Sequence, residues 1–187
     1  MPRPNWFFAF PLDGAFLLEL PEPPPSIRLY QPDDAHLTLA FLGGCGEPAA
    51  LRALGVLDER IAVSPPPILE VSLGDVVPLG RSRSGYTTLS ALLDDGRDEA
   101  TELLSARRDA LHEAATGSVP RRPAKPHVTL ARVRGRASDE NREKGLVWAK
   151  NLDLRAVRAR LDRIALYTWN ENRKEKLFRI VSERRLA

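Results

Sequence analysis

The sequence repeats one order of segments, and this repetition constrains its fold more than any other feature. Each half contains a strand pattern that begins at a histidine, followed by a helix pattern and by two further strand patterns. The strand pattern at Ile68 begins 32 residues after His36, and the same step from His127 reaches the next apolar run. Gly85, just before a further strand pattern, lies 49 residues after His36, and Leu177, where the matching pattern begins, lies 50 residues after His127. Because a duplicated unit keeps its spacing as well as its order, we predict an internal duplication.

Length and composition predict a single folded domain. The chain has 187 residues, 43% of them apolar, which is enough for one buried core. We expect one domain over residues 1–187, made of approximate repeats over residues 1–82 and 83–187. The 28 basic and 25 acidic residues give a net charge of only +3, too small an excess for a protein that coats duplex nucleic acid.

Local patterns predict the secondary structure. Alternating apolar residues and turn residues predict strands at residues 6–12, 27–30, 35–42, 68–77, 86–93, 127–133, 163–169 and 177–182. Apolar residues three and four apart predict helices at residues 48–62 and 98–115, with a polar helix at 139–148 and a short one near 15–20. Clusters of prolines separate these segments, because proline interrupts both helices and central strands.

Two features limit the cellular compartment. A single cysteine, Cys45, cannot form an internal disulfide or build a multi-cysteine metal site. No apolar run approaches the roughly 20 residues that span a bilayer, and Pro11 and Asp13 break the N-terminal apolar segment too early for a signal peptide. We therefore expect a cytoplasmic protein that does not associate with membranes.

Two of the three histidines lie in the same short motif. The motifs are His36-Leu37-Thr38-Leu39 and His127-Val128-Thr129-Leu130. Since alternate residues of a strand point to the same face, each strand presents an imidazole beside a hydroxyl and turns its apolar residues to the core. One such strand is usually an ordinary half-exposed strand, but two copies at matching places favour a shared site. If the halves pack about an approximate two-fold axis, the two pairs face each other across a groove.

This arrangement suits the opening of a cyclic phosphodiester. A water molecule must lose a proton on one side of phosphorus while the leaving oxygen gains one on the other side. A neutral and a protonated histidine coexist near their ordinary pKa of about 6.5 and can act as base and acid. We therefore assign His36 and His127 as catalytic residues. Thr38, Thr129 and Arg132 are the groups expected to bind the phosphate oxygens.

Arg132 can bind the phosphate oxygens only if its side chain reaches the face that carries His127. It also belongs to a cluster of basic residues. In a regular strand it points away from His127, so it reaches the groove only through a bulge, a strong twist or its own length. The stretch from Val119 to Ala137 contains no acidic residue and six basic ones: Arg121, Arg122, Lys125, Arg132, Arg134 and Arg136. The cluster is either a solvated face or a guide for a polyanionic strand, and composition leaves both open.

Other residues complete the set of candidates. Phe8 in the aromatic first strand is assigned to stacking on a nucleobase, although core packing is the ordinary role of such rings. His112 falls near the end of a predicted helix, where a partial positive charge suits the helix dipole. No phosphate-binding glycine motif and no local cluster of metal ligands is present in the sequence, so we expect no cofactor and no metal.

The residues alone leave three functions open. The first is a metal-independent phosphodiesterase that opens cyclic phosphates at RNA ends. The second is a noncatalytic module that binds single-stranded RNA in the same groove. The third is a metal-dependent hydrolase in which His36 and His127 bind zinc together with acidic residues.

These residues resemble the two-histidine phosphoesterases, and within them the RNA 2′,3′-cyclic phosphodiesterases historically called 2′-5′ RNA ligases. The resemblance rests on HLTLAFLG at residues 36–43, on PHVTLAR at residues 126–132 and on FFAF at residues 7–10. A fainter similarity runs through residues 164–167. The resemblance thus extends along almost the whole chain.

The resemblance implies a bilobed α+β fold, in which two antiparallel sheets with outer helices face a central groove and are related by a pseudo-two-fold duplication. It implies that His36 is the acid at the leaving 3′ oxygen and that His127 is the base for water, which leaves a 2′-phosphate. Arg132 matches the arginine that follows the second motif in the family. With an RNA 5′-hydroxyl in place of water, the reverse reaction is 2′-5′ ligation without a nucleoside triphosphate. The implied partners are RNA ends or cyclic nucleotides, and we expect a monomer.

The chain departs from the family pattern in three places. Asp34-Ala35 precedes His36, where the family usually has asparagine and a larger apolar residue. Asn5 stands where an arginine is expected near the first strand, and the glycine and tyrosine expected near residues 176–178 are absent. These departures bear on substrate preference more than on the reaction.

Overall fold

The computed structural model describes residues 3–80 and 85–186. Its strands are β1 (Trp6–Pro11), β2 (Ile27–Leu29), β3 (His36–Gly43), β4 (Leu69–Leu79), β5 (Thr88–Leu93), β6 (His127–Val133), β7 (Arg158–Leu161), β8 (Arg163–Trp169) and β9 (Phe178–Arg185). Its α-helices are α1 (Glu47–Val63), α2 (Arg97–Thr116) and α3 (Asp139–Lys150), and short 3-10 helices are η1 (Ala15–Leu18) and η2 (Pro32–Asp34). The segments predicted from the sequence are confirmed to within a few residues. The expected boundary between the repeats, at residues 82 and 83, lies outside the described residues.

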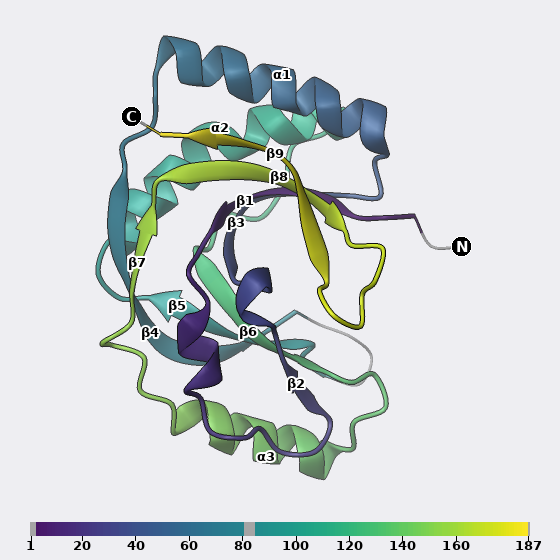
Figure 1. The fold of residues 1–187 in the computed structure, drawn as a ribbon, viewed down its shortest axis with the longest axis vertical. Coiled ribbons are helices and arrows are strands. Elements are labelled where there is room, and N and C mark those ends of the chain that lie inside the picture. Colours follow the sequence, from purple (N-terminus) through teal and green to yellow (C-terminus); the bar gives the residue numbers. More distant parts are fainter. Residues whose placement is uncertain (1–2, 81–84, 187) are drawn as a thin grey trace.

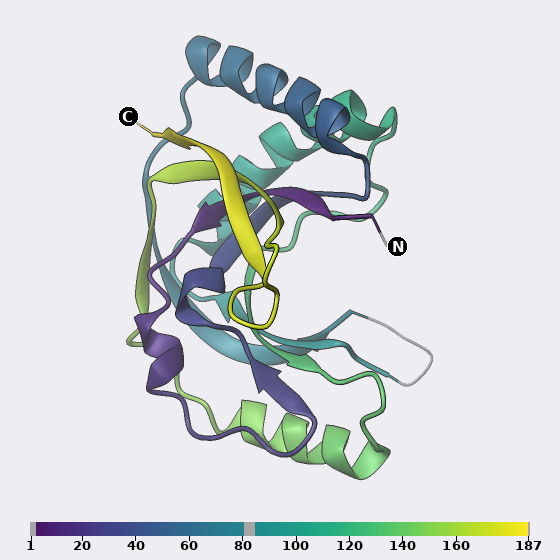
Figure 2. The same cartoon turned by 45° about the vertical axis from the view of Figure 1, so that its right-hand side comes forward.

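The strands form one curled antiparallel sheet, in the order β7-β4-β5-β6-β3-β1-β8-β9 with β2 beside β6 (Figure 1). At its centre β3 and β6 are joined by a single residue pair, Leu37 with Val128. The part of the sheet that contains β3, β1 and β8 lies under α1 and α2, and α3 packs on the part that contains β4 and β6 (Figures 1 and 2). The α+β class is therefore confirmed, and the two expected sheets are the two parts of one sheet that meet at this pair.

The two halves of the sequence are interleaved in this sheet. Strand β4 comes from the first half but pairs with β5, and so joins the part of the sheet that holds the second histidine. Strands β8 and β9 come from the second half and join β1. The duplication itself stays a prediction from the sequence.

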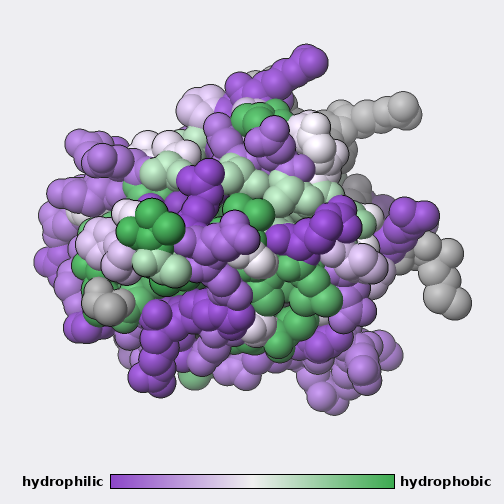
Figure 3. Space-filling view, turned by 90° about the horizontal axis from the view of Figure 1, so that it is seen from above, coloured by the Kyte–Doolittle hydropathy of each residue, from purple (hydrophilic) through white to green (hydrophobic). Residues whose placement is uncertain are grey.

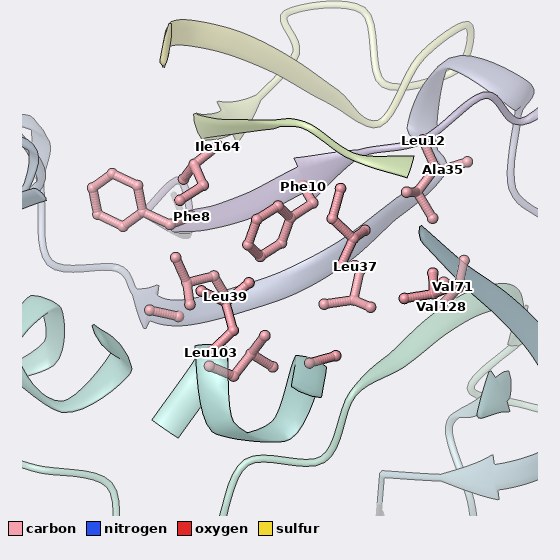
Figure 4. Packing of buried hydrophobic residues seen from close by; sticks show 14 of the residues in the cluster. Phe8, Phe10, Leu12, Ala35, Leu37, Leu39, Val71, Leu103, Val128 and Ile164 are labelled. Atoms are coloured by element: carbon pink, nitrogen blue, oxygen red, sulfur yellow. The ribbon is translucent and has the colours of Figure 1, made fainter. Parts of the chain in front are cut away.

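The main core lies between the sheet and the helices α1 and α2. Phe8, Phe10, Leu37 and Leu39 are each at most 1% exposed, and they pack between β1, β3 and Leu103 of α2 (Figure 4). Complete burial of a side chain of this size stabilises the fold by about 1.5–3 kcal/mol. The same side chains hold β1 and β3 in place, and β3 carries the first of the two motifs.

The outer face over α1, seen from above in Figure 3, is mostly hydrophilic and carries hydrophobic side chains in separate patches. Leu51 and Val63 are exposed apolar residues of α1. Within the described residues, no helix is both long enough and apolar enough to cross a membrane.

Candidate active site

His36 and His127 lie at the starts of β3 and β6, where these two strands meet. Leu37 pairs with Val128 in an antiparallel register, so the same register puts His36 opposite Thr129 and Thr38 opposite His127. Because the alternating residues of a strand share a face, both histidines and both threonines lie on one face of the sheet. The junction of the two parts of the sheet thus brings together four of the residues expected from the sequence.

This face is hollowed into a groove of about 310 Å³. Its lining residues are Asn5, Phe7, Tyr30, His36, Thr38, Phe41, Thr129, Arg132, Trp169, Arg173 and Phe178. A second hollow, of about 240 Å³, continues past Thr38 and Phe41 and is lined by His127, Lys125 and His112. The two imidazoles therefore border adjoining cavities that share Thr38 and Phe41.

Both imidazoles are held in the same way. The Nδ1 atom of His36 lies 2.7 Å from the backbone oxygen of Asp34, and that of His127 lies 2.6 Å from the backbone oxygen of Lys125. A carbonyl oxygen can only accept a hydrogen bond, so Nδ1 must carry the proton and donate it. Each ring is thereby oriented, and its Nε2 atom is the nitrogen that can take or give a proton.

A β-bulge brings Arg132 into the groove. Along the pair of β5 and β6, Leu89 lies opposite Ala131 and Ser90 lies opposite Thr129, so Leu130 is an extra residue. Leu130 and Ala131 are buried in succession, and the residue that follows them shares the groove with Thr129. Of the three possibilities raised by the sequence, namely a bulge, a strong twist or the length of the side chain, the bulge is the one that brings Arg132 into the groove.

The first motif contains the same bulge. Along the pair of β1 and β3, Phe8 lies opposite Ala40 and Ala9 lies opposite Thr38, so Leu39 is the extra residue. Phe41 therefore takes the place that Arg132 has in the second motif; it lines the groove, and the residue is 53% exposed. Sequence reasoning missed Phe41, although its position five residues after the histidine matches that of Arg132. The groove is asymmetric, with a cation on one side and an aromatic ring on the other.

The assignment of Phe8 to base stacking is wrong. Phe8 is 0% exposed and packs in the main core on the face of β1 that turns away from the histidines. Its neighbour Phe7 lies on the other face, lines the groove and has its ring centroid 5.0 Å from that of His36. Since every residue of β1 is buried, the sequence alternation gave no means of telling its two faces apart.

Aromatic rings surround His36. Phe7 stacks parallel to Tyr167 at 5.0 Å between centroids, and Phe178 meets the His36 ring edge-on at 5.6 Å. The pKa of His36 is lowered to about 4: burial of the ring is the largest cause, the bond to the Asp34 oxygen opposes the shift, and the nearby His127 adds to it. Burial also lowers the pKa of His127. Both imidazoles are therefore neutral at pH 7 in the free protein.

The threonines and the basic cluster are placed differently. The buried Ser90 hydroxyl donates to the Thr129 hydroxyl oxygen at 3.4 Å, which leaves the Thr129 proton available for a phosphate oxygen. Of the six basic residues in the cluster, Lys125 and Arg132 line the cavities. All six are exposed, and the four that do not line these two cavities are Arg121, Arg122, Arg134 and Arg136. The cluster is thus partly a solvated face and partly a wall of the groove.

The remaining candidates are a histidine, a cysteine and a metal site. His112 was expected outside the site, but it lines the hollow that also contains His127. Cys45 is partly buried and burial raises the pKa of its thiol, so it is a poor nucleophile. Among residues 3–80 and 85–186, no three histidine, cysteine or acidic side chains gather in one place. Metal independence stays a prediction.

Lowering the pH should destabilise the folded protein, because His36 is buried as a neutral ring. The folded protein keeps this ring neutral down to about pH 4, whereas the unfolded chain protonates it below about 6.5. Its contribution to stability is therefore complete above pH 6.5 and is lost as the pH falls towards 4, by about 2–3 kcal/mol near pH 4.5. His36→Asn keeps a donor but does not titrate, so it should lose less stability between about pH 7 and about pH 4.5 in urea unfolding. Equal losses in both proteins would contradict the burial of a neutral ring.

The fold and the two His-x-Thr motifs define a two-histidine phosphoesterase. More narrowly, the chain belongs to the 2′-5′ RNA ligase superfamily, whose sequence model matches residues 23–173. A comparison with curated protein sequences gave no match.

Solved structures share the fold. TT0787 of Thermus thermophilus is 22% identical, with 97% of each chain covered and a TM-score of 0.68. E. coli LigT complexed with 3′-AMP is 21% identical, with 100% of this chain and 99% of that chain covered and a TM-score of 0.69. Usb1 of Kluyveromyces marxianus is 15% identical, with 87% of this chain and 92% of that chain covered and a TM-score of 0.51. At these identities the likeness concerns the fold.

Proposed function

We propose that this protein hydrolyses the 2′,3′-cyclic phosphate ends of RNA to 2′-phosphates by acid and base catalysis from two histidines. One observation carries the proposal: two imidazoles with their Nδ1 atoms tied to backbone oxygens border adjoining cavities that share Thr38. The same opening of the cyclic phosphate, with an RNA 5′-hydroxyl in place of water, breaks the bond to the 3′ oxygen and forms a 2′-5′ linkage.

The proposed reaction uses each group once. Nε2 of His127 takes a proton from water as the water oxygen bonds to phosphorus, and protonated Nε2 of His36 gives a proton to the leaving 3′ oxygen. Thr38, Thr129 and Arg132 bind the non-bridging oxygens, where negative charge increases in the transition state. These roles follow the family resemblance. After one turnover His127 holds the extra proton and His36 is neutral, so exchange with solvent restores the starting state.

The low pKa of His36 fits this scheme only with substrate bound. A free His36 with a pKa of about 4 is neutral at pH 7 and has no proton to give from Nε2. An opposite charge nearby favours the protonated ring, so the phosphate of the substrate raises this pKa. Binding of the substrate therefore favours protonation of His36, which is the form that can donate a proton to the leaving oxygen.

The alternative function is a noncatalytic module that binds single-stranded RNA. Exposed Phe41 and the half-buried Trp169 offer rings for base stacking, and Arg132 offers a charge for the phosphate backbone. This alternative gives no role to the matched orientation of two imidazoles. The solved E. coli LigT complexes with 3′-AMP and ATP support nucleotide binding in this fold.

A single assay separates these functions. A short RNA with a 2′,3′-cyclic phosphate end is incubated with the protein in the presence of a chelator, and the products are separated. We expect conversion to the 2′-phosphate without added metal. Formation of the 3′-phosphate would reverse the assignment of the leaving oxygen, and activity that returns only with a metal would favour the metal-dependent hydrolase. Tight binding without any product would favour the RNA-binding module.

A further inference from the structure

A separate cavity of about 300 Å³ adjoins the groove and is lined by three arginines. The arginines are Arg28 of β2, Arg132 of β6 and Arg173 from the turn between β8 and β9. The cavity shares Tyr30, Arg132 and Arg173 with the groove. A ligand bound between the histidines therefore reaches this cavity along a continuous wall.

The charges in this cavity are not compensated. Arg28 lies directly opposite Arg132 in the antiparallel pair of β2 and β6. Like charges at directly opposite positions destabilise a sheet. An anion bound between the two arginines would reduce this repulsion. In the described part of the chain, no carboxylate lies within ion-pair distance of Arg28, Arg132 or Arg173.

The acidic residue that lines the cavity is already engaged. Both carboxylate oxygens of Asp34 accept hydrogen bonds from the backbone N–H of Leu177 at 3.0 Å, and one accepts from Phe178 at 3.1 Å. Its neighbour Asp33 pairs with Lys176 at 3.3 Å. Among the described residues, neither carboxylate therefore forms an ion pair with any of the three arginines.

The arginines are held in place around the cavity. The guanidinium of Arg173 lies over the Trp169 ring at 4.1 Å, and its buried Nε atom has no hydrogen-bond partner among the residues that the structure describes. Arg28 donates to the backbone oxygen of Lys174 at 3.2 Å, which ties β2 to the same turn. Burial raises the pKa of Tyr30, the charge of Arg132 opposes this rise, the charge of Asp34 adds to it and that of Arg173 opposes it, so both guanidinium groups act on the Tyr30 hydroxyl.

We propose that this cavity is a second anion subsite, which binds the phosphate one nucleotide away from the reacting end. It rests on the proposed function, in which the cyclic phosphate lies between the histidines. The phosphate it takes is either the internucleotide phosphodiester on the 5′ side of the last nucleoside or the 5′-phosphate of a single nucleotide. Guanidinium groups bind both through charge-assisted hydrogen bonds. The protein then selects ends that carry this second phosphate over a bare nucleoside cyclic phosphate.

Three substrates test the subsite. They are adenosine 2′,3′-cyclic phosphate, the same compound with a 5′-phosphate, and a dinucleotide with adenosine 2′,3′-cyclic phosphate at its 3′ end. In the wild type we expect kcat/KM to be about 10-fold to 100-fold higher for the two substrates with a second phosphate, the range for hydrogen bonds to a charged group. A preference for the dinucleotide alone identifies the internucleotide phosphate as the source. Equal kcat/KM values for all three would overturn the proposal.

Arg28→Gln is the matched variant, because Arg28 lines the separate cavity and is exposed. It should reduce the preference severalfold, towards equal kcat/KM values. Arg136→Gln removes the same charge from an exposed position in the basic cluster and should keep the preference. An equal loss in both variants would mean that general charge attraction, and not the subsite, produces the preference.

A binding measurement separates this proposal from the proposed function. Calorimetry with adenosine 2′-phosphate and adenosine 2′,5′-bisphosphate needs no turnover. Arg28→Gln should weaken binding of the bisphosphate severalfold and leave binding of the monophosphate unchanged, so that the ratio between the two ligands falls severalfold from its wild-type value. If binding follows this pattern while no substrate is hydrolysed, the subsite stands and the proposed function fails. If hydrolysis occurs but Arg28→Gln changes neither ratio, the subsite fails alone.

Discussion

Alanine at His36 or at His127 is expected to lower kcat for cyclic phosphate opening by about 10²–10⁴-fold, the usual contribution of a positioned acid or base. Each imidazole performs one proton transfer that the other cannot reach, because they lie on different sides of the phosphate in the proposed reaction. Rapid-quench or gel assays of a defined RNA end measure the effect. The double variant should be little worse than either single one, since both groups serve the same step.

The control for this prediction is His112→Ala. His112 lines the hollow beyond His127, but nothing in the described residues orients its ring towards the groove as Asp34 and Lys125 orient the other two. We expect kcat to change by less than about threefold on the scale of acid and base effects. Circular dichroism establishes that each variant is folded. Full activity in His36→Ala or in His127→Ala would sink the two-histidine mechanism.

Alanine at Asp34 is expected to cost about 2–4 kcal/mol of stability, since it removes the acceptor of two partly buried backbone N–H groups. The Asp34 side chain is 1% exposed and ties the residues before β3 to Leu177 and Phe178 at the start of β9. Phe178 meets the His36 ring edge-on, so the loss should also lower kcat by displacing this ring. Urea unfolding and kcat measure the two effects.

Asp34→Asn separates the hydrogen bonds from the charge. Asparagine keeps one side-chain oxygen for the backbone N–H groups and carries no charge, whereas burial disfavours the charged carboxylate and raises the pKa of Asp34. The backbone oxygen that accepts from Nδ1 of His36 is the same in every variant. Asp34→Asn should therefore lose less than half of the stability that Asp34→Ala loses. An Asp34→Ala variant as stable as the wild type would show that these hydrogen bonds do not hold β9 to the site.

The sequence determined most of the local structure and the two histidines. Alternation placed His36 beside Thr38 and His127 beside Thr129, because side chains of a strand alternate in direction wherever the backbone is regular. Helix spacing and proline clusters gave the bounds of α1, α2 and α3 within a few residues. These features depend on hydrogen bonds and burial between residues that are near in the chain, so a short window of sequence contains them.

Only the tertiary structure decided the rest of the site. The bulges at Leu39 and Leu130 are set by neighbouring strands, and they turn Phe41 and Arg132 into the groove. Phe7, and not Phe8, lines the groove because the helices α1 and α2 pack on the face of β1 that carries Phe8. The sequence could not show this, since β1 is buried on both faces. Arg28 and Arg173 lie far apart in the sequence and meet only because β2 pairs with β6 beside the turn before β9. Such contacts follow from the packing of the whole sheet, which no single segment encodes.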